Sequence, residues 1–171
     1  MPELEEERHL LRVLERARIP FAMHHFAAEH LSAIEVAAQV GVDPARVYKT
    51  LVAIPAGSKP VLAMLAAPSS LDLKSLARVL GVKQVAMATQ AQAESLTGLR
   101  VGGIGALALL SKGWRTVLDR SALTVPEGSI LVSAGRRGIN LEISVADLIG
   151  VLSPIVAAVS RPQEPGASKA R

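Results

Sequence analysis

Cysteine is absent from this chain of 171 residues, and aromatic residues make up only 2% of it. Without cysteine the protein has no disulfide, no thiolate nucleophile and no cysteine-based zinc site. The scarcity of aromatic side chains argues against a single-strand RNA binder of the stacking type, because such platforms place Phe, Tyr or Trp beneath the bases. Small aliphatic residues must build the core, and contact with an RNA backbone or a structured RNA fits this composition better.

No segment has the character of a signal peptide or a membrane span. The N-terminal residues include Glu3 and an acidic run from Glu5 to Glu7, whereas a signal peptide begins with a basic region. The most apolar late stretch, residues 145–159, contains Asp147 and Pro154 and is shorter than the ~20 residues that a membrane-spanning helix needs. We expect a cytoplasmic protein.

Length and charge fit one domain with an anionic partner. Half of the chain is hydrophobic, and no repeat or internal linker is visible. After Ser160 the sequence turns polar and contains Pro and Gly, so we expect a single domain over residues 1–160 and a flexible tail over residues 161–171. The net charge of +4 permits a polyanionic partner. Basic residues crowd the second half of the chain at Lys112, Arg115, Arg120, Arg136 and Arg137.

Helix and strand patterns alternate at short spacing, which predicts a mixed α/β fold of the α+β kind. The expected helices span residues 10–17, 32–41, 73–80 and 89–96, and a last one begins at Ser144. The expected strands span residues 21–26, 47–54, 61–67, 82–87, 115–119, 129–133 and 139–143. Residues 56–59 are typical of a hairpin loop, so the strands on either side of them should be antiparallel neighbours.

One lysine interrupts an apolar run that otherwise has the composition of a buried strand. Lys49 would share one face of this strand with Val47, Leu51 and Ala53, because side chains alternate along a strand. A buried ammonium must find a partner, reach water or line a pocket that a ligand fills. Lys49 is therefore a candidate site residue. The alternative is a lysine near the start of a strand whose long stem carries the charge out to water.

A glycine-rich segment, residues 97–105, is the second candidate. The pair Gly102-Gly103 lets the backbone approach a ligand closely or adopt a positive φ. Exposed N–H groups in such a loop can bind an oxyanion or a phosphate. The glycine spacing fits neither the dinucleotide-binding fingerprint nor the P-loop. A bulge or a tight turn is the common alternative for a Gly-Gly pair.

A third candidate segment, residues 132–138, joins the end of one expected strand to the start of the next. Ser133 offers a hydroxyl there, and Arg136 and Arg137 lie between two glycines. Arginines in such a loop can bind phosphates. The alternative is a pair of solvated arginines on a hairpin tip.

The sequence predicts neither a metal site nor a serine-hydrolase site. His24 and His25 are adjacent, so in a strand they would point to opposite faces, and His9 and His30 complete no ligand set with them. The chain has no Gly-x-Ser-x-Gly elbow. We expect no metal and no cofactor.

Four segments, taken in order, resemble the successive motifs of the YbaK-like aminoacyl-tRNA deacylases. They are residues 47–52, 71–77, 97–103 and 132–148, and the resemblance extends over about residues 10–152. Members of this family hydrolyse mischarged tRNA and are similar to the editing insertion domain of bacterial prolyl-tRNA synthetase. The resemblance implies a partly barrel-like mixed β-sheet flanked by helices. It also implies a metal-independent ester hydrolase that edits Cys-tRNA(Pro) or Ala-tRNA(Pro), with tRNA and prolyl-tRNA synthetase as partners.

The resemblance also implies the residues of the site. Lys49 falls on the family's functional lysine, and Gly102 and Gly103 fall on its substrate-loop glycines, so these three are expected to be catalytic. The positions expected to bind substrate are Thr50, Ile104, Gly105, Ser133, Ala134, Gly135 and Asn140. Arg136 and Arg137 are expected to bind tRNA. Backbone N–H groups near the glycines would stabilise the tetrahedral oxyanion, while Lys49 would hold the 3′-terminal phosphate or orient water.

Three positions depart from the family pattern. Gly105-Ala106 stands where Ser-Pro is common, Leu99 where an aromatic residue is common, and Asn140 where Asp is common. Two other functions stay open on the sequence. One is a non-catalytic tRNA-binding or synthetase-associated module, and the other is a small-molecule hydrolase that uses the same pocket.

Overall fold

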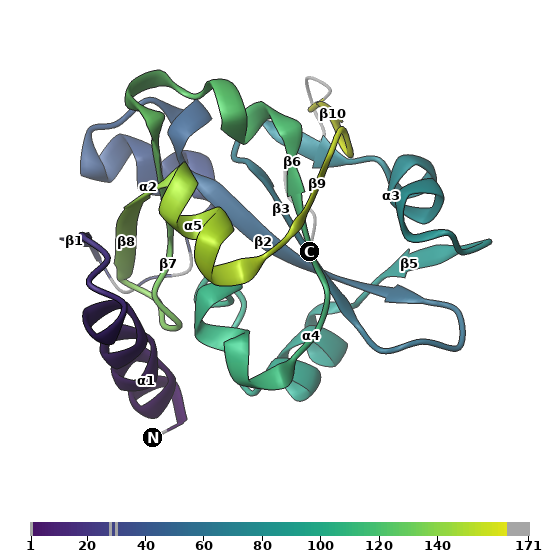
Figure 1. The fold of residues 1–171 in the computed structure, drawn as a ribbon, viewed down its shortest axis with the longest axis horizontal. Coiled ribbons are helices and arrows are strands. Elements are labelled where there is room, and N and C mark those ends of the chain that lie inside the picture. Colours follow the sequence, from purple (N-terminus) through teal and green to yellow (C-terminus); the bar gives the residue numbers. More distant parts are fainter. Residues whose placement is uncertain (1, 28, 30, 164–171) are drawn as a thin grey trace.

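The computed structural model of the protein describes residues 2–27, 29 and 31–163. The strands in this part form a five-stranded sheet, a three-stranded sheet and a two-stranded ribbon (Figure 1). The orders are β5-β2-β3-β6-β9 for the first, β1-β8-β7 for the second and β10-β4 for the third. The bounds are β1 (Ala22–His25), β2 (Tyr48–Pro55), β3 (Val61–Ala66), β4 (Ser69–Leu71), β5 (Val85–Met87), β6 (Thr116–Asp119), β7 (Ser129–Ser133), β8 (Ile139–Ser144), β9 (Ile155–Ala157) and β10 (Ser160–Pro162).

Short helices connect and cover these strands. The α-helices are α1 (Pro2–Arg16), α2 (Ala33–Val40), α3 (Leu73–Leu80), α4 (Gln90–Thr97) and α5 (Val145–Leu152). Short 3₁₀ segments are η1 (Pro44–Arg46), η2 (Leu107–Lys112), η3 (Arg120–Thr124) and η4 (Pro126–Gly128). Local chemistry sets several of the helix ends. In α2, Ser32 and Glu35 form a reciprocal capping box, and Gly41 ends the helix in the left-handed conformation at φ 79°.

Strand β2 connects the two larger sheets. Most of its length pairs with β3 in antiparallel register, and its end pairs with β5. Just before it, Val47 forms a parallel bridge with Leu131 of β7. The two sheets therefore meet where β2 begins, and β2 leads away from this junction toward the hairpin at the opposite end of the molecule (Figure 1).

The two faces of β2 pack into different hydrophobic clusters. Tyr48 and Val52 belong to the main core, which lies between the two larger sheets and includes the residues that precede η2. Leu51 and Ala53 point the other way, into a second cluster that α3 covers with Leu76. Side chains alternate along a strand, so Thr50 faces the main core and Lys49 faces the side of the second cluster.

The expected mixed α+β fold is confirmed, as is the antiparallel pairing of residues 47–54 with residues 61–67. The barrel-like expectation holds only in part, because the described strands form separate sheets joined through one isolated bridge. The short strands β4, β9 and β10 were not predicted from the sequence. These strands have three residues each, too few for an alternating pattern to show.

The expectation of a flexible tail from residue 161 does not hold for its first residues. Arg161 and Pro162 lie in β10, because the edge of β4 offers backbone groups with which residues 160–162 pair in antiparallel register. The remainder of that tail, residues 164–171, lies outside the described residues. Among the described helices, none has the length and apolar character to cross a membrane.

Candidate active site

Lys49 lies half-buried in β2, on the face opposite Thr50. Its Nζ donates a hydrogen bond to the carbonyl oxygen of Ala67, 3.1 Å away, just beyond the end of β3. Burial lowers the pKa of this amine, because the charged form loses hydration. No carboxylate of the described residues forms an ion pair with it. Its charge is therefore not neutralised within the described protein and can be offered to an anionic ligand.

A row of polar side chains continues from Lys49 onto the second sheet. Beyond the parallel bridge between Val47 and Leu131, Lys49 and Ser133 each lie two residues further along their strands. Val47 and Leu131 pack in one cluster, so Lys49 and Ser133 share that face. In the antiparallel pair, Ser133 is directly opposite Asn140, which is buried. The structure thus brings Lys49, Ser133 and Asn140 to one surface.

The glycine loop, residues 101–106, is tied to its surroundings by side chains from three other parts of the fold. Its hydrogen bonds join Val101 N to Glu94 Oε1 (3.1 Å), Arg137 Nε to Val101 O (2.7 Å), Ser133 Oγ to Gly103 O (2.9 Å) and Ala106 N to Thr50 Oγ1 (3.2 Å). The anchoring side chains come from α4, β2 and the β7–β8 hairpin. The conformation of the glycine loop is therefore fixed by tertiary contacts.

Glycine is required in this loop for two reasons. Gly102 has φ 95°, which side-chain-bearing residues rarely adopt. Gly103 and Gly105 pack directly against the β7–β8 hairpin. A Cβ at Gly103 would lie 2.8 Å from the Cα of Arg136, and one at Gly105 would lie 2.4 Å from the carbonyl oxygen of Ser133. The glycines serve close backbone packing as well as a turn.

Several backbone donors in the glycine loop have no acceptor. Within the described residues, nothing accepts a hydrogen bond from the N–H of Gly102, Ile104 or Gly105. The Gly103 N–H is used inside the loop, where it donates to the carbonyl oxygen of Arg100 at 2.8 Å. Gly102 is exposed, but Ile104 and Gly105 are buried, and buried N–H groups are rarely left unpaired in proteins. A rigid loop with free donors has the arrangement that binds an oxyanion or a phosphate.

Most of the other predicted site residues in the β7–β8 hairpin have side chains that contact the rest of the protein. Arg136 Nε bonds to the carboxylate of Glu7 in α1, and Arg137 holds the glycine loop through Val101. Ala134 is fully buried in the main core, as is most of Ile104. Gly135, at φ 108°, packs against Ala108. These side chains shape and support the site, and those of Ala134 and Ile104 are not open to a ligand.

A charged cluster that was not predicted from the sequence lies beside this row. Arg46 is buried and donates through its guanidinium to Glu142 Oε1 at 2.7 Å and to Ser129 Oγ at 2.6 Å. His24 Nε2 lies 2.7 Å from the other oxygen of Glu142. His24 also pairs with Asn140 across β1 and β8. A signal was available, because β8 alternates apolar and polar residues, which places Asn140 and Glu142 on the same face.

The cluster holds Glu142 in its charged form. The hydrogen bond with His24 has the largest effect on the pKa of Glu142 and lowers it. Burial opposes ionisation, but hydrogen bonds from Arg46 and Ser129 and the positive charge of Arg46 add to the lowering. The pKa of Glu142 therefore lies below its usual range, and the cluster gives the edge of the polar row a fixed geometry.

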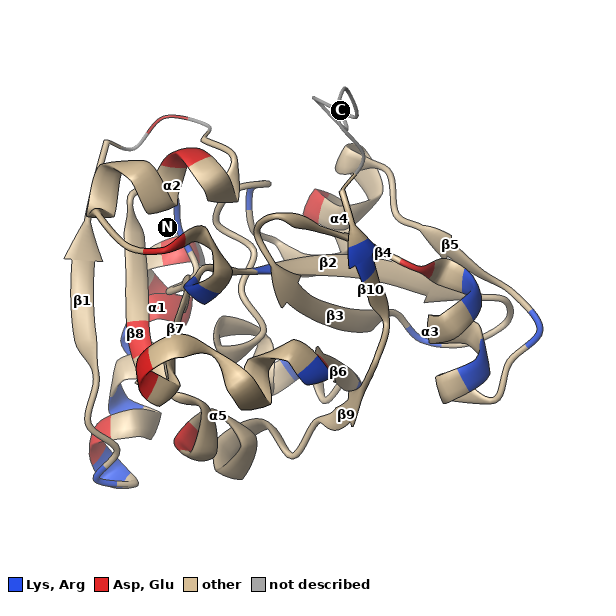
Figure 2. Ribbon diagram, turned by 90° about the horizontal axis from the view of Figure 1, so that it is seen from above, with Lys and Arg blue, Asp and Glu red and all other residues tan. Residues whose placement is uncertain are grey.

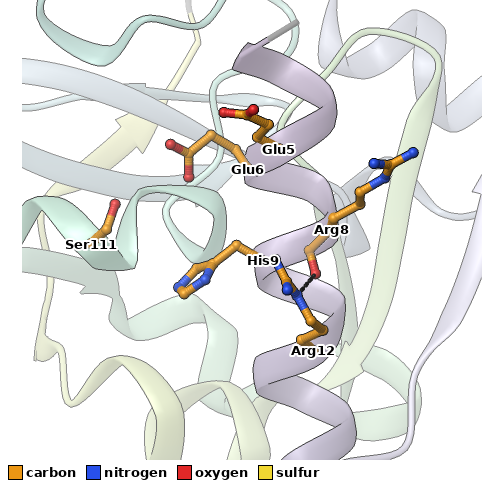
Figure 3. Close-up of a pocket in the computed structure, with 6 residues that line it drawn as sticks. All are labelled: Glu5, Glu6, Arg8, His9, Arg12 and Ser111. Carbon is orange, nitrogen blue, oxygen red and sulfur yellow. Dashed lines mark hydrogen bonds between the residues drawn. The ribbon is translucent and has the colours of Figure 1, made fainter.

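A surface depression of about 460 Å³ lies elsewhere, over α1. Figure 3 shows it lined by Glu5, Glu6, Arg8, His9 and Arg12 of α1 and by Ser111 of η2. None of these residues is among those that the sequence predicted for the site. The depression is open and its charged side chains are solvated, so we place the candidate site at the glycine loop and the polar row.

The described residues contain no group of three or more His, Asp or Glu side chains that could hold a metal ion. His24 is engaged with Glu142, and His30 lies outside the described residues.

The protein is an α+β domain in which the candidate site lies near the junction of the two larger sheets, with Lys49 on β2 and the glycine loop anchored to the β7–β8 hairpin. The sequence profile of the aminoacyl-tRNA editing domain family matches residues 28–151. The chain belongs to this family, whose members are aminoacyl-tRNA deacylases.

Individual relatives agree with this placement. The chain is 33% identical over 142 residues to an Enterococcus faecalis protein named "Putative Cys-tRNA(Pro)/Cys-tRNA(Cys) deacylase EbsC", covering 82% of this chain and 85% of that protein. A crystal structure of the hypothetical protein APE2540 superposes with a TM-score of 0.81 at 24% identity, covering 89% of this chain and 99% of the other. A "putative trans-editing enzyme for prolyl tRNA synthetase" superposes with a TM-score of 0.78 at 19% identity, covering 94% and 98%. The two structures show the same fold.

Proposed function

We propose that this deacylase hydrolyses the ester of mischarged tRNA(Pro), with Cys-tRNA(Pro) as the first substrate and Ala-tRNA(Pro) as the second. The printed name of the Enterococcus faecalis relative supports a cysteinyl ester. We also propose that the protein acts in the cytoplasm and that prolyl-tRNA synthetase is the partner that supplies the mischarged tRNA. The observation that carries it is the glycine loop, which is anchored by four side chains and presents free backbone donors.

Ester hydrolysis places negative charge on the carbonyl oxygen when water attacks. Donors that already point at the position of this oxyanion stabilise the transition state without having to reorganise. The N–H groups of Gly102, Ile104 and Gly105 are such donors, and Ser133, Thr50 and Arg137 hold the backbone that carries them. Removing one donor of this kind typically costs about 10²–10³ in kcat.

Lys49 supplies the positive charge of the site. It shares its face with Ser133, which holds the glycine loop, so a substrate that reaches the loop from this face passes the ammonium. We propose that Lys49 binds the 3′-terminal phosphate or the polar groups of the terminal nucleotide. The attacking water is positioned by the substrate and the loop, and bringing it close to the ester accounts for part of the rate.

Size selects the amino acid. A small pocket excludes prolyl and larger groups, while a synthetase cannot reject a smaller amino acid strongly by binding alone. The side chains of Ile104 and Leu99 are buried in the main core and belong to the fixed packing around the glycine loop.

A substrate panel with matched variants tests this function. Purified protein is incubated with Cys-tRNA(Pro), Ala-tRNA(Pro), Ala-tRNA(Ala) and Pro-tRNA(Pro), with and without chelator, and release of the amino acid is followed. We expect turnover of the first two, no effect of chelator, and loss of at least tenfold in kcat/KM for Lys49→Ala. Lys112→Ala, an exposed lysine near Trp114, is the control and should keep full activity. Binding of tRNA without turnover on any substrate would contradict the proposal and leave a tRNA-binding module.

A further inference from the structure

Five exposed basic residues lie on α3, just after α3, on β10 and in the β2–β3 hairpin, which belong to the same half of the molecule (Figure 2). We call them the basic track: Lys59, Lys74, Arg78, Lys83 and Arg161. No aromatic residue occurs between residues 51 and 93, and the one carboxylate in that range is Asp72. Residues 51–93 thus contain four basic residues against one acidic residue, and Arg161 of β10 adds a fifth positive charge. Positive charge therefore exceeds negative charge in this part of the molecule.

The protein itself does not neutralise these charges. No residue of the basic track takes part in an ion pair with another described residue. Asp72 is occupied as the cap of α3, where its Oδ1 accepts from the N–H groups of Lys74 and Ser75. Arg161 is near enough to lower the pKa of Asp72, after the larger effect of the bond from Ser75. The other four cations form no ion pair with a described residue.

Helix α3, which carries Lys74 and Arg78 of the basic track, lies on the same side of the five-stranded sheet as Lys49. Helix α3 packs on this face through Leu76, which shares a cluster with Leu51 of β2. The backbone also connects the track to the site. Lys49 bonds to the carbonyl oxygen of Ala67, and the next carbonyl, that of Pro68, accepts from the N–H of Gln163 at the end of the ribbon that carries Arg161.

The length of the track suits a helical stem. Pro55 lies six positions after Lys49 along β2, which at about 3.3 Å per residue corresponds to about 20 Å. Lys59 lies beyond that end, in the hairpin. Duplex nucleic acid carries a phosphate charge at intervals much shorter than this, so several phosphates can face the track while the 3′ end reaches Lys49.

We propose that the basic track binds the phosphate backbone of the tRNA acceptor stem while the 3′-terminal nucleotide occupies the site at Lys49. This inference rests on the proposed function, because it assigns the body of the same substrate. The absence of aromatic side chains from this region favours a base-paired stem over an unpaired strand, since unpaired bases need stacking partners. Backbone contact requires only positive charge and confers no sequence preference.

The test compares two triple variants with equal charge change. Lys74→Gln, Arg78→Gln and Lys83→Gln remove three charges from the track, and Arg8→Gln, Arg12→Gln and Arg16→Gln remove three exposed charges from α1. Binding of uncharged tRNA(Pro) and of an acceptor-stem hairpin is measured by fluorescence anisotropy at several salt concentrations. We expect the track variant to weaken binding about tenfold or more at about 0.15 M salt and to reduce the logarithmic salt slope by about 2–3. The α1 variant should bind as the wild type does.

Activity separates this inference from the proposed function. The track variant should raise KM for aminoacyl-tRNA and leave hydrolysis of a small aminoacyl ester unchanged, because that ester has no stem. If no aminoacyl-tRNA is hydrolysed but the track variant still loses tRNA binding, the proposed function fails and the binding surface stands. Any of three results would overturn the inference. The first is equal tRNA binding by the wild type and the track variant, and the second is a loss of binding in the α1 variant equal to that in the track variant. The third is equal affinity for an unpaired RNA of the same length as the acceptor-stem hairpin.

Discussion

The hydroxyl of Ser133 donates a hydrogen bond to the carbonyl oxygen of Gly103, 2.9 Å away, and accepts one from the N–H of Gly135 at 3.2 Å. One side chain at the end of β7 thus links the β7–β8 hairpin to the glycine loop. Because Ser133 also shares a face with Lys49, it connects the two halves of the candidate site.

Replacing Ser133 should affect the chemical step more than stability. In Ser133→Ala the glycine loop loses one anchor, so we expect kcat to fall at least tenfold with little change in KM, and the free energy of unfolding to fall by about 1 kcal/mol. Ser133→Thr keeps a hydroxyl and should recover much of the activity. Single-turnover deacylation and urea unfolding measure the two effects. A variant with full kcat would show that this anchor does not position the loop for catalysis.

Gly105 tolerates no side chain, whereas Gly150 does. A Cβ at Gly105 would lie 2.4 Å from a backbone oxygen of Ser133, so Gly105→Ala must push the glycine loop off the hairpin. We expect this variant to lose about 1–3 kcal/mol of stability and at least 10²-fold in activity. Gly150 in α5 has open space, and Gly150→Ala should be neutral or stabilising by up to about 1 kcal/mol with full activity. Thermal unfolding and deacylation of the pair check this contrast.

Arg137 offers a test between two roles. The sequence predicts contact with tRNA, while the structure shows its Nε bonded to the carbonyl oxygen of Val101 at 2.7 Å. If the arginine positions the loop, Arg137→Gln lowers kcat and leaves the salt slope of tRNA binding unchanged. If it binds a phosphate, the slope falls by about 1 and KM rises. We expect the first result, measured with the same anisotropy titrations as the triple variants.

Asp119 should make the fold sensitive to acid. Its buried carboxylate accepts hydrogen bonds from the N–H groups of Val159 (2.9 Å), Ser160 (3.0 Å) and Ser121 (3.2 Å). Burial by itself would raise its pKa, but these hydrogen bonds outweigh burial and hold the pKa below its usual range. The folded pKa is therefore below the unfolded one. The resulting stability is present above about pH 4 and is lost as the pH falls through the folded pKa.

The variant Asp119→Asn isolates this contribution. It keeps the shape but replaces one acceptor oxygen by a donor, so we expect a loss of about 1–3 kcal/mol at pH 7 and a weaker decline between about pH 4 and pH 2. Urea unfolding at a series of pH values gives both quantities. An unchanged acid profile would show that other carboxylates, such as Glu142, dominate the acid response.

Lys49 should lower the free energy of unfolding while it supports deacylation. Burial lowers its pKa, so the charged form is less favourable in the folded state than in the unfolded one. This cost is fully present below the folded pKa and is relieved as the pH rises toward the unfolded value. Lys49→Met keeps the stem volume without the charge. We expect its unfolding midpoint at pH 7 to equal or exceed that of the wild type, together with loss of deacylation. A large fall in the midpoint would instead indicate a structural lysine.

The sequence by itself determined the elements whose causes are local. Helix α2 follows from the capping box of Ser32 and Glu35 and from the left-handed Gly41, and the hairpin of β2 and β3 follows from apolar runs on either side of a short turn. Periodicity and caps act within a few residues, so they can be seen along the chain. The order of the motifs, with Lys49 first and the two glycine-bearing segments after it, also predicted the family.

Only the tertiary structure decided how these segments meet. Thr50 lies 56 residues from Ala106, and His24 lies 118 residues from Glu142, yet each pair is joined by a hydrogen bond. Likewise, Arg137 turns inward to the glycine loop and not to solvent. Such contacts depend on how sheets and loops pack, and close packing at Gly103 and Gly105 leaves the loop one position against the hairpin. The sequence predicted the residues of the candidate site, and packing determined which of them share a surface and which support the loop from within.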